Sequence, residues 1–141
     1  MTIEEISAYV ESLGGVLTLR PAPGDGTPEL AWGDVFFYYA PDGVVPNGQP
    51  FATVVTKDYP GEPSSALAPG DFRVNVDAGR RGQADVGDPT RRDQVMPHPT
   101  YGHLGWICVV QPGPGSTAEL QTRLRDAHHA SARRWKRRSN T

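Results

Sequence analysis

The sequence contains a single cysteine and no long apolar run. Cys108 is the single cysteine among 141 residues, which excludes an intramolecular disulfide framework and a cysteine-rich zinc site. No apolar run approaches the ~20 residues of a membrane-spanning helix. The acidic segment 1–10 also lacks the basic region and apolar stretch of a signal peptide. We therefore expect a cytoplasmic protein without a membrane span.

Glycine and proline are the abundant residues. Together they account for 30 of 141 residues, or about 21%. This share is below the roughly 25–30% that is typical of low-complexity disorder. The glycines and prolines also separate apolar segments instead of clustering, so they predict one β-rich domain with many turns.

Charge divides the chain into two parts. The net charge is −2, yet residues 1–132 carry nine Lys and Arg against 16 Asp and Glu, a net of −7. The remaining five cations lie between Arg133 and Arg138. We expect residues 1–132 to form a single domain and residues 133–141 to form a basic, flexible tail.

The periodicity predicts a helix at each end of the domain. Thr2 and Glu5 have the spacing of a capping box, and a helical apolar stripe follows them. Ser116 precedes a second such stripe. Between the helices we expect strands at residues 16–20, 30–40, 51–57, 72–77 and 104–110. This order favours an α+β fold, with an antiparallel sheet of about five strands flanked by an N-terminal and a C-terminal helix. The segment from Arg80 to Val95 has no periodicity and is expected to be a long loop.

The segment 97–103 has the strongest character of a functional site. It brings two imidazoles and a phenol together just before a buried strand. His98 is a candidate general base, because its ordinary pKa is close to neutral pH, and Tyr101 is a candidate donor to an oxyanion. The alternative is structural, with both rings covering the end of the sheet and bonding loop carbonyls.

Two further groups of polar residues lie on or beside strands. Lys57, Asp58 and Tyr59 follow one strand, where Lys57 is a candidate anion-binding residue, although a Lys–Asp pair at a strand end is often simply solvated. Arg73 and Asn75 share one face of another strand. They would form the polar floor of a ligand site, or else a solvent-facing surface.

These residues suggest a pocket at the strand ends that binds a small polar or aromatic metabolite. In this hypothesis Asp58, Tyr59, Arg73, Asn75 and Trp106 contact the ligand. A cofactor-free proton transfer would use His98 as base, Tyr101 as oxyanion donor and Lys57 to hold an anion. No metal or cofactor is expected, because the spacing of the histidines matches neither a zinc finger nor a helical His pair. The protein would be a monomer or a homodimer.

A nucleic-acid-binding module is the alternative function. Five cations surround Trp135 near the C-terminus, so they would contact phosphates while the indole stacks on a base. The same cations would also complement the dipole of a helix C-terminus, and the acidic body would repel a polyanion.

Several longer motifs carry a resemblance to known families. They are GDGxPExxWGDxFFYYxPDG (24–43), PFATxVTKDYPG (50–61), RVN (73–75) and PHPxYGxxGW (97–106). Together they resemble an actinobacterial domain of unknown function that covers nearly the whole chain. The layout is also distantly similar to the YjbR/MmcQ-like families. That similarity implies a double-wing α+β fold and a role in secondary metabolism or resistance.

Overall fold

A six-stranded antiparallel sheet with two helices forms the protein, and we describe it from a computed structural model that covers residues 1–79 and 87–139. The strand order is β1-β2-β3-β4-β6-β5. The elements are α1 (Ile3–Ser12), β1 (Val16–Leu19), η1 (Glu29–Ala31), β2 (Val35–Tyr39), β3 (Ala52–Val55), β4 (Arg73–Asp77), β5 (Met96–Pro97), η2 (Gly102–Leu104), β6 (Trp106–Val110) and α2 (Thr117–Ser139). The predicted α+β class is confirmed. The sixth strand is the two-residue β5, which is too short to show any periodicity in the sequence.

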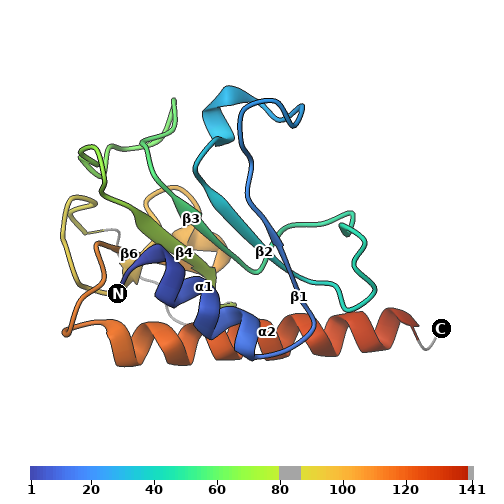
Figure 1. The fold of residues 1–141 in the computed structure, drawn as a ribbon. Helices are drawn as coiled ribbons and strands as arrows, with labels where there is room; N and C mark the ends of the chain where they lie inside the picture. The colour runs from blue at the N-terminus through green and yellow to red at the C-terminus, as the bar shows by residue number, and fades with distance from the viewer. Residues whose placement is uncertain (80–86, 140–141) are drawn as a thin grey trace.

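Both helices cover the same face of the sheet (Figure 1). Alternation along the strands turns Val74 and Val76 of β4 towards them, where both are fully buried. Ile6 of α1 and Leu124 of α2 complete this packing with no exposed surface. We call this the helix face of the sheet. Burial of its apolar side chains supplies the main favourable free energy of folding.

The opposite face of the sheet carries a different set of side chains. In the register of β3 with β4, Val55 lies opposite Arg73 and Thr53 lies opposite Asn75. Their side chains point away from the helices, yet Arg73 and Asn75 are only 3% and 5% exposed. The loops between the strands must therefore cover this second face, and they do so with polar partners for the buried groups.

The helix ends follow local sequence signals to different degrees. The capping box of Thr2 and Glu5 is present at the start of α1, as predicted. At the start of α2, however, the Ser116 hydroxyl donates to Asp93, whose carboxylate also accepts the backbone N–H groups of Gly113 and Gly115. The described end of the long loop between β4 and β5 thus holds the first turn of α2. Residues 80–86 of that predicted loop lie outside the described residues.

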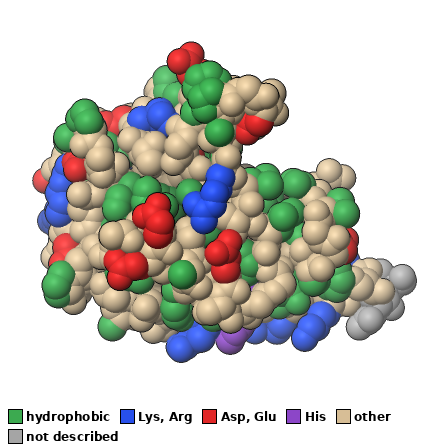
Figure 2. Space-filling model, in the orientation of Figure 1, with side chains coloured by type: hydrophobic (Ala, Val, Ile, Leu, Met, Phe, Trp, Pro, Cys, Tyr) green, Lys and Arg blue, Asp and Glu red, His purple; other side chains and the backbone are tan. Residues whose placement is uncertain are grey.

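Helix α2 continues through the basic segment to Ser139. Residues 133–139, expected from the sequence to belong to a basic tail, form the last two turns of this helix, and the flexibility of the segment stays a prediction. Cations in the last turn complement the helix dipole, which favours the continuation. Lys and Arg side chains gather along the lower edge of the molecule, over α2 (Figure 2).

Packing of α2 on the helix face should contribute strongly to stability. Leu124→Ala removes a side chain that has no exposed surface, so we expect the free energy of unfolding to fall by about 2–5 kcal/mol. Leu104→Ala is the matched control, because Leu104 is 57% exposed and should change stability by no more than about 0.5 kcal/mol. Urea unfolding of the two variants measures both values. Equal effects would contradict the packing described here.

Candidate functional site

A pocket of about 260 Å³ opens on the second face of the sheet. Its residues come from β2, β3, β4 and β6, from the segments before and after β3, and from the segment after β5. They are Phe36, Tyr38, Gln49, Pro50, Thr53, Val55, Tyr59, Glu62, Arg73, Asn75, His98, Tyr101 and Trp106. Six of the predicted site residues therefore line one pocket: Tyr59, Arg73, Asn75, His98, Tyr101 and Trp106. Lys57 and Asp58 do not line it.

Arg73 occupies the floor of the pocket and is almost fully buried. Its Nε donates to Asn75 Oδ1 at 2.9 Å and its Nη1 donates to Ser65 Oγ at 2.9 Å. Nη2 donates to Glu62 Oε1 at 3.3 Å, which is its ion pair. Asn75 in turn donates to Thr53 Oγ1 at 3.0 Å. A buried cation is tolerated only with such partners, so these contacts fix the loop that carries Glu62 and Ser65 against the sheet.

His98 follows β5 directly and is 2% exposed. Its backbone N–H donates to the Trp106 carbonyl, which continues the pairing of β5 with β6. Its Nδ1 accepts the backbone N–H groups of Thr100 and Tyr101 at 3.0 and 3.1 Å. A neutral imidazole carries one proton, so an Nδ1 that accepts requires the proton to be on Nε2. Nε2 lies 3.3 Å from Arg73 Nη2.

Burial and the Arg73 charge both act on the protonation of His98. Burial is the larger cause, and the nearby guanidinium adds to it; together they lower the pKa of His98 from 6.5 to about 3. The imidazole is therefore neutral near pH 7 and presents an N–H donor at Nε2. A general base needs a free lone pair, and the only lone pair here already accepts two backbone N–H groups. The geometry thus favours a binding role for His98 over the predicted base role.

Glycines allow the tight turn between His98 and β6. A Cβ on Gly102 would lie 3.0 Å from the Cβ of Pro97, so glycine lets these two residues approach closely without displacing the proline. Gly105 has φ = 93°, a left-handed conformation that glycine adopts without strain, and it leads into β6. This turn holds the Tyr101 ring 5.0 Å from the His98 ring.

Aromatic side chains provide the apolar part of the lining. Phe36 and Tyr38 project from β2 on the second face, because Val35, Phe37 and Tyr39 take the helix face. Trp106 begins β6, and Tyr101 is 44% exposed at the rim. The pocket thus combines aromatic sides with a polar, buried floor.

Lys57 belongs to a separate network outside the pocket. Its Nζ donates to the Trp32 carbonyl at 2.9 Å and to Asp34 Oδ1 at 3.2 Å. Asp34 is 1% exposed and also accepts from the backbone and hydroxyl of Thr56 and from the Tyr59 hydroxyl. Burial and the bond to Asp34 raise the pKa of Tyr59, so its phenol stays protonated. Lys57 therefore neutralises a buried carboxylate, and this network positions Tyr59.

Asp58 shapes the loop that approaches Arg73. Its carboxylate accepts from the Ser64 hydroxyl at 2.8 Å and from the Ser65 backbone at 2.9 Å. These bonds outweigh the effect of burial and lower the pKa of Asp58, so it is ionised at neutral pH. Asp34, Glu62 and Ser65 were not predicted as site residues, because nothing in their spacing indicates which distant groups they pair with.

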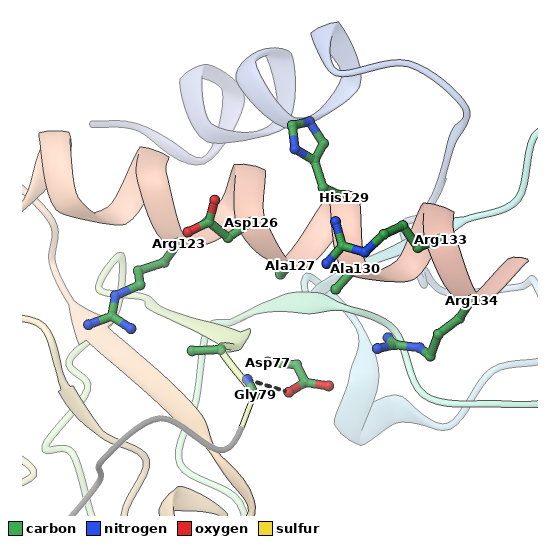
Figure 3. Close-up of a pocket in the computed structure, with 10 residues that line it drawn as sticks. Asp77, Gly79, Arg123, Asp126, Ala127, His129, Ala130, Arg133 and Arg134 are labelled. Carbon is green, nitrogen blue, oxygen red and sulfur yellow. Dashed lines mark hydrogen bonds between the residues drawn. The ribbon is translucent and has the colours of Figure 1, made fainter. Parts of the chain in front are cut away.

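A second hollow of about 330 Å³ lies between α2 and the end of β4, but its chemistry is less specific. Arg123 and Arg134 lie at opposite ends of it, and Asp77 lies between them (Figure 3), while Asp126 of α2 also lines it. Asp77 already accepts from the Gly79 backbone at 3.1 Å. The two carboxylates offset part of the positive charge of the arginines. The described residues of this hollow therefore do not favour a ligand of one charge.

The described residues were also compared with the requirements of a metal site, a membrane span and a reactive thiol. Among residues 1–79 and 87–139, no group of three or more His, Cys, Asp or Glu is placed to hold a metal ion. In that same part of the chain, no helix has the length and apolarity needed to cross a bilayer. Cys108 is fully buried with its Sγ 3.9 Å from the Pro97 carbonyl, and burial raises the pKa of the thiol to about 11.

Comparison with known protein families gives one match, which covers residues 1–140. The chain belongs to DUF6194, a family of unknown function. No curated protein and no solved structure matched this DUF6194 chain. The resemblance to a family of unknown function is thereby confirmed, and the family itself assigns no activity to the pocket.

The buried His98 of this DUF6194 chain should make its stability depend on pH. In the unfolded chain the imidazole takes up a proton below about pH 6.5, whereas the native imidazole does so only near pH 3. The native state is thus destabilised as pH falls through this window, by about 1.4 kcal/mol per pH unit. His98→Asn, whose side-chain oxygen can still accept the two backbone N–H groups, should lose this dependence. Urea unfolding at pH 7, 5.5 and 4.5 measures the difference in slope.

His103→Asn is the control for this comparison, since His103 lies in the same turn but is exposed. It should keep the pH dependence of the natural chain. Parallel pH profiles for the natural chain and His98→Asn would contradict the neutral, buried imidazole.

The assignment of Lys57 to the Asp34 network also predicts a stability effect. Lys57→Met leaves the buried Asp34 carboxylate without its cation, so the free energy of unfolding should fall by about 1–2 kcal/mol. Lys136→Met, at an exposed position of α2, should have little effect on the same urea transition. Unchanged stability of Lys57→Met would show that the ion pair contributes nothing to the fold.

Proposed function

We propose that this DUF6194 protein binds a small metabolite with an apolar or aromatic body in the pocket on the second face of the sheet. The observation that supports this most directly is a buried, polar floor beneath aromatic sides. Small-molecule sites typically combine an apolar lining with a few placed polar groups. A volume of about 260 Å³ is small for such sites and matches a ligand the size of a substituted single ring.

Binding is better supported than catalysis of a proton transfer. His98 offers a donor at Nε2, Lys57 is held by Asp34, and the Tyr101 ring stands at the rim. These three residues were the predicted base, anion-binding residue and oxyanion donor. The contacts of His98 support a role in ligand recognition, those of Lys57 support a role in stability, and Tyr101 is proposed to cover the bound ligand.

The nucleic-acid alternative has weaker support. It requires the Trp135 ring to be free for stacking, but that ring packs edge-on against Tyr39 with centroids 6.0 Å apart. Arg133 and Arg134 of the basic segment also line a hollow together with Asp77 and Asp126 (Figure 3). A role in secondary metabolism or resistance, the YjbR/MmcQ-like similarity, a cytoplasmic location and the oligomeric state stay predictions.

Tyr101 provides a test of the pocket. We expect indole, phenol, benzoate or benzamide to bind, with chemical-shift changes at backbone amides around Arg73 and His98. Tyr101→Ala should weaken this binding about 2- to 10-fold, because it removes an aromatic contact at the rim. NMR titration of the isotope-labelled protein measures both effects.

Leu104→Ala is the matched control, since Leu104 is an exposed side chain of the same turn that does not line the pocket. It should leave the affinity unchanged. If none of the probes shifts the pocket amides, or if both variants lose affinity equally, the proposed function is wrong.

A further inference from the structure

The floor of the pocket places two hydrogen-bond donors against each other. Arg73 Nη2 and His98 Nε2 are 3.3 Å apart. A guanidinium has no acceptor atom, and Nε2 carries the imidazole proton because Nδ1 accepts from Thr100 and Tyr101. Neither group can therefore accept from the other. The contacts among the described residues leave the Nε2–H of a side chain that is 2% exposed without an acceptor, at the edge of a cavity.

An oxygen atom placed between these donors would resolve the conflict. A buried N–H without an acceptor is costly, and one oxygen with two lone pairs can accept from both nitrogens. The pocket lies at this position, so the missing acceptor fits a group of the ligand. The donor pair thus specifies a ligand oxygen at the floor and leaves the aromatic sides for the apolar body.

The charge around Arg73 favours an anionic oxygen over a neutral carbonyl. Two of the guanidinium contacts go to neutral groups, Asn75 Oδ1 and Ser65 Oγ. Its negative partner is Glu62, which reaches it through one oxygen at 3.3 Å. Hydrogen bonds from a guanidinium to a carboxylate are about twice as strong as those between neutral groups. A ligand carboxylate would gain this advantage at Nη2 and would satisfy His98 as well.

Glu62 uses the same guanidinium nitrogen, Nη2, that faces His98. It lines the pocket from the loop after β3 and remains partly exposed, with 17% of its side-chain surface accessible. An incoming carboxylate would compete with it for Nη2, and the displaced Glu62 can turn towards solvent. Glu62 therefore keeps the buried guanidinium neutralised when the pocket is empty.

We propose that the pocket selects small carboxylic acids, with the ligand carboxylate accepting from Arg73 Nη2 and His98 Nε2 in place of Glu62. This inference rests on the proposed function and names its ligand class. The apolar part of the acid would lie between Phe36, Tyr38 and Trp106. A single aromatic ring with a short carboxylate arm fits the volume of about 260 Å³.

Matched acids and amides test the selection. Benzoate and phenylacetate are titrated against the labelled natural chain by NMR, beside the isosteric neutral compounds benzamide and phenylacetamide. We expect the acids to bind about tenfold more tightly or better, because the amide replaces one oxygen with a donor and removes the charge. Equal affinity for acids and amides would overturn the inference while the proposed function stands. Failure of all four compounds to shift the pocket amides would also overturn the inference, and the proposed function itself falls only if indole and phenol fail as well.

Glu62→Gln tests the competition at Nη2. The variant removes the negative charge that opposes the ligand, so affinity for the acids should rise about tenfold and affinity for the amides should not change. Glu119→Gln is the matched control, because it removes the same charge from an exposed pair with Arg123 on α2 and should alter neither affinity. Unchanged or weaker acid binding by Glu62→Gln would show that Glu62 does not occupy the carboxylate position.

Two His98 variants distinguish the donor role of Nε2 from the role of Nδ1, which accepts the backbone N–H groups of the turn. His98→Asn keeps an acceptor for the Thr100 and Tyr101 N–H groups but lacks the Nε2–H, so acid affinity should fall about tenfold. His98→Gln places an amide N–H near the Nε2 position and should recover part of the acid affinity although the turn loses its acceptor. The opposite ranking of these variants would overturn the role assigned to Nε2.

Discussion

The burial of Arg73 beneath the loops on the second face of the sheet is the constraint on which the site depends. A guanidinium with 3% exposure must satisfy its charge and its donors within the protein. The partners come from β4 itself and from the loop after β3, and His98 of the segment after β5 lies against the same guanidinium. Segments about 40 residues apart in the sequence are thereby drawn to one point. The pocket is the space that these polar contacts leave above the sheet.

A second buried charge supports the first. Asp34 lies before β2 and accepts from Thr56, Lys57 and Tyr59, which all follow β3. Asp34 therefore links the start of β2 to the start of the loop that reaches Arg73. Asp58 then fixes the next part of that loop through Ser64 and Ser65. The two networks are successive steps along one segment, so disturbing the Asp34 pair would also displace Glu62 and Ser65.

Local patterns in the sequence predicted both helices, five of the six strands, and six of the thirteen residues that line the pocket. Alternation along residues 72–77 correctly separated Val74 and Val76 from Arg73 and Asn75, because a strand turns successive side chains to opposite faces. The expected position of segment 97–103 just before a buried strand is confirmed, because β6 follows it. Lys57 shows where such reasoning ends: its partner Asp34 lies 23 residues away, and only the pairing of β2 with β3 brings the two together. Neither the tautomer of His98 nor the packing of Trp135 on Tyr39 leaves a signal in the sequence.

The position of Cys108 gives the protein a natural reporter. The thiol lies in β6 opposite Met96 of β5, has no exposed surface, and contacts the carbonyl of the residue that precedes His98. A reagent can reach this sulfur only when the side chains packed around it, among them Met96 of β5 and Leu67, move away. Since the chain contains a single thiol, the rate at which Cys108 is alkylated reports how often the segment that carries His98 opens. No label has to be engineered for this measurement. Any molecule that holds that segment closed would lower the alkylation rate of Cys108.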